Sequence, residues 1–439
     1  MRTHSKRREL PITTRIAYFI YQIAYHLALP LSGLFALWRA RKEPGHLYHM
    51  SHRWGLGPVG VKGGVWIYAA SLGEMNAARP LVQEFLNDGH HVLLTHLSPA
   101  GFDRGVQQFG NDPRVTHLYA PFDCFWTVQL FLRRAKPAFG IVLEIEIWPA
   151  MLIEADRLSI PMFMANGNLL MNRMKRLQTW RRHGLYLYRL FDHIFTRSQD
   201  YVERYIATGV RPEAVSTTGE LRFDTQPDSA LLDYGRDLRR TWNANFTFMI
   251  ASSVKSEEAI LLKIVTDFLQ AAPQARVIWV PRSPQRFDAI AKLLKFCEIP
   301  CTRRSQLIDS LNSESKVLIG DTLGEIDLYL GLADVVFVGA SFTDMGGHNI
   351  IEPLSAGCPV IMGPSTYGVD FVARPAQQAG VFETFKTPHA MYTHLLALNK
   401  DLPSVQMKQK KAKAFASLNS NTAKLIVKNI NKRNNHTNG

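Results

Sequence analysis

Short apolar runs alternate with helical patterns along most of the chain. The first series of runs lies at residues 65–70, 91–96, 115–120, 139–144, 161–166 and 193–197. A loop is predicted at 71–74, a helix at 75–88 and a further helix around 101–109. Strands that alternate with helices in this way predict a doubly wound parallel sheet.

A second series of runs begins after the turn-forming segment Thr225-Gln226-Pro227-Asp228. These runs lie at residues 246–251, 275–280, 316–319, 335–339 and 359–362. We therefore predict an α/β protein with two Rossmann-like parallel-sheet domains that face a cleft. Ligands of such sheets bind beyond the carboxyl ends of the strands, where the loops with candidate chemistry lie.

Four segments follow from this pattern. We predict a basic start with an apolar helix at 1–45 and a first Rossmann-like domain at 46–226. A second such domain occupies 227–405, and a basic helix or tail occupies 406–439.

The apolar stretch at 16–38 has the length that a bilayer span requires, about 20 residues. Gln22, His26 and Pro30 interrupt it, and arginines flank both sides. We expect a membrane anchor, either one span or an interfacial helix. A helix packed on its own domain is the alternative.

Positive charge is concentrated at the two ends of the chain. Of the net charge of +14, residues 1–62 supply +8, with ten basic against two acidic residues, and residues 400–439 supply +8, with nine against one. This distribution favours an anionic membrane surface over nucleic acid. A solvated tail is the alternative for the C-terminal run. The four cysteines are scattered, which indicates a reduced cytosolic protein without a zinc site.

The stretch 337–353 changes from a buried strand to a glycine-containing loop. It continues through Gly346 and Gly347, and we expect a helix to open near His348 and Asn349. Glycine N–H groups at a helix start favour a phosphate, and Glu352, about one turn further on, suits ribose hydroxyls. A glycine turn with a glutamate that merely complements the helix dipole is the alternative.

Six stretches in order resemble the 3-deoxy-D-manno-octulosonate (Kdo) transferases of lipopolysaccharide assembly, a family of GT-B glycosyltransferases. The resemblance covers roughly residues 45–400. The matching stretches are Ser71-Leu72-Gly73-Glu74, 143–149, 218–224, 280–287, 320–325 and the stretch that ends after Glu352.

This resemblance implies transfer of Kdo from CMP-Kdo to a lipid A precursor at the cytoplasmic face of the bacterial inner membrane. Such enzymes invert the anomeric centre and use no active-site metal or cofactor. Glu74 stands at the position of the family's catalytic glutamate, where a carboxylate suits general-base catalysis. A helix acid in the first turn is the alternative.

The resemblance also indicates the binding residues. Arg282 and the backbone of Gly346, Gly347 and His348, with Asn349 beside them, are expected to meet the CMP phosphate, and Glu352 the ribose. Ser71, Gly73, Glu144 and Glu146 are expected near the acceptor.

Glu144 and Glu146 alternate by two, so on a strand they face the same side. Two adjacent carboxylates raise one pKa, which would suit proton transfer. A pair held by backbone N–H groups and arginines is the alternative.

Two loops depart from the family pattern, at 167–170, where an arginine is missing, and at 252–258. A diverged paralogue that uses another envelope glycan acceptor is therefore an alternative. A nucleotide-sugar epimerase of the same fold and a catalytically silent glycan- or lipid-binding protein are further alternatives.

Overall fold

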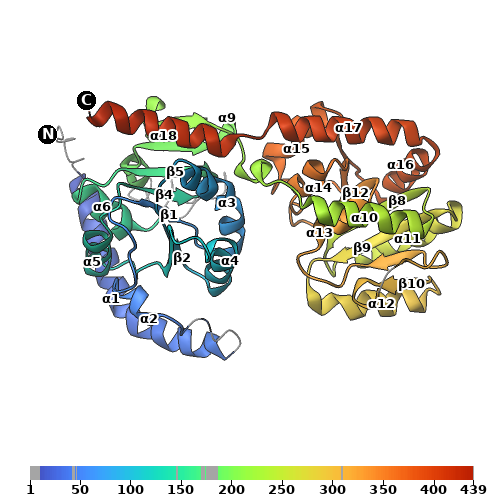
Figure 1. Ribbon diagram of the computed structural model, residues 1–439, viewed down its shortest axis with the longest axis horizontal. Coiled ribbons are helices and arrows are strands. Elements are labelled where there is room, and N and C mark those ends of the chain that lie inside the picture. The colour runs from blue at the N-terminus through green and yellow to red at the C-terminus, as the bar shows by residue number, and fades with distance from the viewer. Residues whose placement is uncertain are drawn as a thin grey trace. The chain divides into compact units, whose positions relative to one another are not determined.

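The computed structural model describes residues 10–41, 45, 47–144, 147–169, 174, 186–307 and 310–438. The chain forms two compact units, shown in Figure 1. Unit 1 comprises Met1–Thr225 and Ser420–Gly439, and unit 2 comprises Gln226–Asn419. The sequence analysis placed the division at 226/227 and treated 406–439 as one segment, whereas the structure divides that segment between the two units.

Unit 1 contains a seven-stranded parallel sheet in the order β3-β2-β1-β4-β5-β6-β7. Apolar side chains alternate along its strands, so that Trp66 and Tyr68 join one buried cluster and Val65 and Ile67 join the cluster on the opposite face. The elements are β1 (Val65–Tyr68), α3 (Leu72–Asn87), β2 (Val92–His96), α4 (Pro99–Phe109), β3 (Val115–Tyr119), α5 (Phe125–Ala135), β4 (Phe139–Leu143), α6 (Pro149–Arg157), β5 (Met162–Gly167), β6 (His193–Thr196), α9 (Gln199–Ala207) and β7 (Val215–Thr217).

Unit 2 contains a second seven-stranded parallel sheet in the order β10-β11-β9-β8-β12-β13-β14. The elements are α10 (Ser229–Trp242), β8 (Phe246–Ser253), α11 (Glu258–Ala271), β9 (Ala275–Pro281), α12 (Phe287–Phe296), β10 (Cys301–Arg303), β11 (Val317–Ile319), α13 (Ile326–Leu332), β12 (Val335–Val338), α14 (Ile351–Ala356), β13 (Val360–Met362), α15 (Asp370–Gln378), β14 (Phe382–Thr384), α16 (Pro388–Lys400) and α17 (Leu402–Leu418). The prediction of two parallel sheets is confirmed. The short strands β7, β10 and β14 were not predicted.

In both sheets the order of the strands reverses beside the first strand, so that later strands are added on its other side. In unit 1, β1 lies between β2 and β4, and in unit 2, β8 lies between β9 and β12. These positions are the topological switch points at which open α/β sheets bind ligands beyond the carboxyl ends of the strands.

Helix α1 (Ile12–Ala40) packs on unit 1 through its polar face. Gln22 Nε2 donates to Asp123 O at 3.0 Å, and Gln22 Oε1 accepts from Phe125 N at 3.0 Å. Trp126 Nε1 donates to His26 Nε2 at 3.0 Å. The polar residues that interrupt the apolar stretch therefore attach the helix to its own domain, together with the hydroxyl groups of Tyr18, Tyr21 and Tyr25.

The opposite face of α1 is apolar and exposed. Its exposed side chains include Ile12, Ile16, Phe19, Ile20, Ile23 and Leu27. Within the described part of the chain, no helix has both the length and the apolar character needed to cross a membrane.

The last helix returns to unit 1 and completes its core. In α18 (Thr422–Asn438), Ile426 and Ile430 are fully buried in the cluster that also contains residues of α3. The Asp224 carboxylate accepts hydrogen bonds from the backbone N–H groups of Thr422 and Ala423 at 3.1 and 2.6 Å. A solvated tail is therefore wrong for the described residues of this segment.

Candidate functional site

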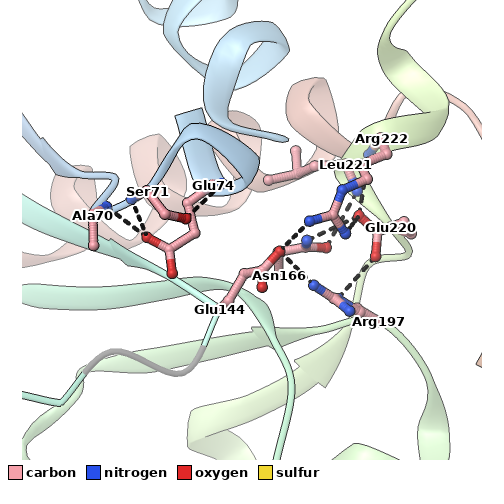
Figure 2. A network of polar contacts seen from close by, with 9 residues as sticks. All are labelled: Ala70, Ser71, Glu74, Glu144, Asn166, Arg197, Glu220, Leu221 and Arg222. Atoms are coloured by element: carbon pink, nitrogen blue, oxygen red, sulfur yellow. Dashed lines mark hydrogen bonds and ion pairs between the residues drawn. The ribbon is translucent and has the colours of Figure 1, made fainter. Parts of the chain in front are cut away.

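Glu74 lies directly beyond the carboxyl end of β1, in the first turn of α3. Ser71 Oγ accepts from Glu74 N at 3.3 Å, while Glu74 Oε2 accepts from Ala70 N at 2.5 Å and Ser71 N at 3.3 Å (Figure 2). This reciprocal arrangement is a capping box. The predicted loop at 71–74 is therefore wrong, because α3 begins at Leu72. Glu74 is a first-turn acid with only 7% of its surface exposed.

The residue before Glu74 is a glycine in an ordinary helical conformation. Among the described residues, a Cβ at Gly73 would come within 4 Å of Ser71 Oγ alone, at 3.9 Å. Packing within the protein therefore does not require glycine here. The space beside Glu74 is compatible with the predicted place of Gly73 near the acceptor.

Glu144 follows β4, the neighbour of β1, and has a left-handed backbone with φ of 60°. Its Oε1 lies 2.6 Å from Nη2 of Arg197 and 2.6 Å from Nη2 of Arg222. Burial raises the pKa of the Glu144 carboxyl, but the two guanidinium groups outweigh burial and hold the pKa below its ordinary value.

Glu144 is therefore not the member of the pair with a raised pKa, and its carboxylate is held by arginines, which agrees with one part of the alternative. Because Glu144 lies beyond the strand with a positive φ, the expected strand alternation with Glu146 does not begin from a strand residue. Glu146 itself lies outside the described residues.

The network around Glu144 extends to three residues to which the sequence analysis gave no role (Figure 2). Arg197 Nε lies 2.8 Å from Oε2 of the buried Glu220. Asn166 Nδ2 donates to Glu220 Oε1 at 2.9 Å. The network therefore joins the carboxyl ends of β4, β5 and β6 to the segment before residue 221.

Two signals in the sequence pointed to this network. Glu220 and Arg222 lie in the matching stretch 218–224, and Arg197 ends a predicted strand. The structure places Arg197 and Arg222 beside Glu144, so the loop at 167–170 without an arginine does not leave this part of the unit without positive charge.

In unit 2, Glu257 occupies the corresponding switch point and is fully buried. Its carboxylate accepts from the backbone N–H groups of Ala340 at 2.7 Å, Val254 at 3.1 Å and Ser341 at 3.3 Å. Burial raises the pKa of Glu257 above its ordinary value, although these hydrogen bonds lower it. A Cβ at Gly339 would lie 2.5 Å from Glu257 Oε1, so glycine is required there. The divergent loop 252–258 therefore fixes the loop that follows β12, a role the sequence analysis missed.

The glycine pair in that loop serves the turn itself. Gly346 and Gly347 have φ of +83° and +78°. Gly346 N donates to Ser365 Oγ at 3.0 Å, and Gly347 N donates to Ala340 O at 2.9 Å. The prediction that these two N–H groups face a phosphate is therefore wrong, because both already have partners within the protein.

The residues after the glycine pair form the entry to α14, which begins at Ile351 and not at His348. Asn349 Oδ1 accepts from Ile351 N at 2.9 Å and so fixes this entry. Glu352 is exposed in the first turn.

His348 and Arg282 both lie beyond the carboxyl ends of strands, and the charge of Arg282 acts on the His348 imidazole. Burial lowers the pKa of His348, and the charge of Arg282 lowers it further. His348 Nε2 is buried and has no hydrogen-bond partner among the described residues. Arg282 is exposed, whereas Arg286 forms an ion pair with Glu258. Arg286 is thus engaged within the protein, whereas Arg282 has no ion pair with the described residues.

A cavity of about 520 Å³ lies beyond β12 and β13. The sequence analysis did not predict it. Its lining residues are Ser341, Phe342, Thr343, Asp344, Pro364, Ser365, Thr366, Tyr367 and Asp370. Gly346 N donates to Ser365 Oγ and so supports one residue of the cavity lining.

Comparison with known proteins identifies relatives across most of the chain. Residues 43–225 match the family model described as 3-deoxy-D-manno-octulosonic-acid transferase (kdotransferase). The 3-deoxy-D-manno-octulosonic acid transferase of Haemophilus influenzae is 30% identical over 387 residues, covering 87% of this chain and 90% of the relative. That of Bordetella pertussis is 31% identical over 378 residues, covering 82% and 86%.

Solved structures share the fold at low identity. The crystal structure of a putative UDP-N-acetylglucosamine 2-epimerase from Listeria monocytogenes is similar with a TM-score of 0.59 and 14% identity, covering 85% of this chain and 97% of that chain. This likeness supports the GT-B-like arrangement of two parallel-sheet domains and carries no information on the reaction. The transferases of H. influenzae and B. pertussis, in contrast, match in sequence over both units. The chain is a glycosyltransferase that belongs to the 3-deoxy-D-manno-octulosonic acid transferase family.

Proposed function

We propose that the protein transfers Kdo from CMP-Kdo to a lipid A precursor, with inversion at the anomeric carbon and without a metal ion. Family membership supports the sugar and the reaction class. The observation that carries the proposal is the position of Glu74, a buried carboxylate held beyond the carboxyl end of β1 at the switch point of unit 1.

Glu74 would act as the general base. Its Oε2 is fixed by the N–H groups of Ala70 and Ser71, which sets the orientation of the whole carboxylate. Oε1 would take the proton of the acceptor hydroxyl as the hydroxyl oxygen bonds to the anomeric carbon. The bond from that carbon to the phosphate oxygen breaks, and CMP leaves with the electron pair. A carboxylate oriented before substrate arrives needs little reorganisation in the transition state.

Unit 2 would bind the donor. Arg282 and His348 would donate to the phosphate of CMP, with Asn349 fixing the loop that carries His348. The exposed Glu352 would accept from the ribose hydroxyls, and the cavity beyond β12 and β13 is large enough for part of the nucleotide. In this proposal the side chains of Arg282 and His348 bind the CMP phosphate, in place of the N–H groups of Gly346 and Gly347.

Helix α1 would attach the enzyme to the cytoplasmic face of the inner membrane as an interfacial helix. Support comes from its two faces, of which the polar one binds unit 1 and the apolar one is exposed. A lipid-linked acceptor would then be available in the same plane. Replacing Phe19 and Ile23 by serine should reduce sedimentation with phospholipid vesicles while leaving CMP binding unchanged.

The decisive experiment is a transfer assay with CMP-Kdo generated in situ and a tetraacylated lipid A precursor, comparing wild type with Glu74→Gln. The glutamine keeps a carbonyl oxygen for the helix cap but cannot take the proton. We expect a loss of at least about a hundredfold in rate, on the scale of general-base removal. CMP affinity should be unchanged, because Glu74 lies in unit 1. Chelation of divalent metal ions should not alter the wild-type rate.

Two results would change the proposal. Full activity of Glu74→Gln would reduce Glu74 to a helix-capping residue. Wild-type protein that binds CMP but forms no product would indicate a paralogue that uses another acceptor.

A further inference from the structure

A second cavity in unit 2 lies at the edge of the sheet opposite to the proposed donor site. It has a volume of about 690 Å³. Its lining includes Asn243, which precedes β8, Asp334, which precedes β12, and Cys358, which precedes β13. It therefore lies at the amino ends of the central strands, whereas Glu257 and His348 lie at the carboxyl ends.

Cationic side chains from two helices converge on this cavity. Helix α10 supplies Arg236, Arg239 and Arg240, and α17 supplies Lys410 and Lys413. Asp334 is the only carboxylate residue among those that line it. The basic run at 408–413 is thus divided, because Lys408 forms an ion pair with Glu383 while Lys410 and Lys413 line the cavity.

The backbone geometry fixes these helices in place. A Cβ at Gly235 would lie 2.1 Å from Leu328 O, and one at Gly331 would lie 2.3 Å from Leu232 O, so α10 and α13 cross in direct backbone contact. A Cβ at Gly357 would lie 2.7 Å from Cγ and Cε of Lys413, so the lysine stem lies along this glycine. The site is therefore built by close packing, with the Lys413 stem held against its wall.

Of the five cationic side chains that line the cavity, only Arg239 is paired with a carboxylate that also lines it. Arg239 forms a two-pronged pair with Asp334, at 2.7 and 2.6 Å, and also donates to Leu332 O at 3.3 Å. Lys410 and Lys413 have no carboxylate partner within the described ranges. The lysine pair is thus available to an anion.

Arg236 and Arg240 are held only by weak pairs. Their partners Asp233 and Asp237 are exposed neighbours one turn away on α10 and do not line the cavity. Such exposed pairs contribute little and give way to a stronger partner. The C-terminal ends of α10, α13 and α14 each add at most about half a negative charge, which leaves the cavity positive overall.

We propose that this cavity binds a phosphate-bearing anion, in which phosphate oxygens bridge Lys410 and Lys413 of α17 and the arginines of α10. Guanidinium and ammonium groups from two helices suit a group with several acceptor oxygens. The phosphate comes either from a soluble phosphorylated molecule or from a phospholipid headgroup. The site is independent of the proposed donor and acceptor chemistry.

The test compares the full chain with Lys410→Ala/Lys413→Ala and with a matched control, Lys400→Ala/Lys411→Ala. The control removes the same charge from exposed positions on α16 and α17 that do not line the cavity. Binding of inorganic pyrophosphate is measured by calorimetry with CMP present at saturation, so that the donor site is occupied. Sedimentation with phosphatidylcholine vesicles, with and without phosphatidylglycerol, is measured in parallel.

We expect the cavity variant to bind at least about tenfold more weakly than wild type, and the control within about twofold, because charge-assisted hydrogen bonds are lost only in the former. A selective loss of pyrophosphate binding identifies a soluble anion, and a selective loss confined to phosphatidylglycerol vesicles identifies a lipid headgroup. Equal loss in both variants, or no binding of either probe by wild type, overturns the proposal. CMP affinity should be equal in all three proteins.

Discussion

Glu144 in unit 1 and Glu257 in unit 2 lie beyond the carboxyl ends of their sheets and are held by different means. In unit 1, Glu144 and Glu220 are held by the guanidinium groups of Arg197 and Arg222. In unit 2, Glu257 is held by backbone N–H groups and has no Lys or Arg partner in the described part of the chain. At Glu144 the protein thus balances charge against charge, whereas at Glu257, as at Glu74 in unit 1, it balances a charge against peptide dipoles.

The difference matters for what each site has left to offer a ligand. In unit 1 two arginines are committed to carboxylates of the protein itself. In unit 2, Glu257 has no side-chain cation among the described residues, and Arg282 and His348 are the groups proposed above to bind the donor phosphate. A site that must receive an anion benefits from the second arrangement, because a carboxylate paired to Arg282 would compete with a phosphate.

The backbone conformations of the residues that follow β4 and β12 can be compared in the same way. Glu144 after β4 and Ala340 after β12 both have left-handed conformations, with φ of 60° and 61°. Non-glycine residues in this region cost of the order of 1–3 kcal/mol each, so both loops are held against strain. The guanidinium network holds Glu144, and the Glu257 carboxylate holds the N–H of Ala340.

The largest expected effect is that of Arg197→Met. Arg197 is buried, and its removal leaves Glu144 with one cation and the buried Glu220 without its closest one. We expect the free energy of unfolding to fall by about 3–5 kcal/mol, as for other broken buried ion pairs. Urea unfolding measures this. The control, Arg211→Ala, breaks an exposed pair with Glu213 and should cost less than about 1 kcal/mol. Equal effects of the two variants would show that charge balance does not hold unit 1.

Glu257→Gln should have the next largest effect. An amide has only one acceptor oxygen, so at least one buried N–H group among Val254, Ala340 and Ser341 loses its partner. The expected cost is about 1–3 kcal/mol. Hydrogen exchange should accelerate at Ala340 and Ser341, and CMP should bind more weakly. Glu258→Gln is the control, because that neighbour pairs with Arg286 and should leave these amides unchanged.

Gly346→Ala, compared with Gly324→Ala, separates the steric effect of an added Cβ from the cost of a positive φ angle. A Cβ at Gly346 would lie 2.8 Å from Gly368 N, and φ is +83°. Gly324 has a φ of +82° with nothing within 4 Å of a Cβ. Both variants should lose about 1 kcal/mol from the left-handed backbone, and only Gly346→Ala should weaken CMP binding. Unchanged CMP affinity in Gly346→Ala would separate the glycine turn from donor binding.

The smallest expected effect is on how the free energy of unfolding depends on pH. Its direction differs between Glu144 and Glu257. The folded-state pKa of Glu144 lies below the ordinary value of 4.5, so its contribution is present above that pH and is lost as pH falls through the folded pKa. The folded-state pKa of Glu257 lies above 4.5, so its contribution is present below that pH and is lost as pH rises through the folded pKa. Unfolding of wild type, Glu144→Gln and Glu257→Gln across this range should therefore show opposite slopes of the mutational difference. Slopes of the same sign would contradict the comparison.

Most of the long strands could be predicted from the sequence, because each is a continuous apolar run. Segments with the periodicity of a helix separate these runs. The short edge strands β7, β10 and β14 were missed, since three residues carry little periodic signal. The helix start at Leu72 was missed even though Ser71 and Glu74 have the spacing of a capping box. Local signals were therefore sufficient there and were outweighed by the functional interpretation of the same residues.

The residues proposed to act in the site were each indicated by a single motif. Glu74, Arg282 and His348 lie in the matching stretches, and the structure puts Arg282 near His348. Glu144, Arg197 and Glu220 each lie in a stretch that the sequence analysis marked, but these stretches are far apart in the chain, so their contact could not be predicted. Whether a glycine N–H is available to a ligand also depends on distant partners, such as Ser365 for Gly346.

The return of α18 to unit 1 has a consequence for biosynthesis. Ile426, Val427 and Ile430 belong to the core of unit 1 but are synthesised after all of unit 2. On the ribosome, unit 2 can therefore complete its core while unit 1, although translated first, still exposes the face of α3 that these side chains cover. The first unit to emerge is thus the last to be finished, and a chaperone that shields apolar surface would meet it during that interval.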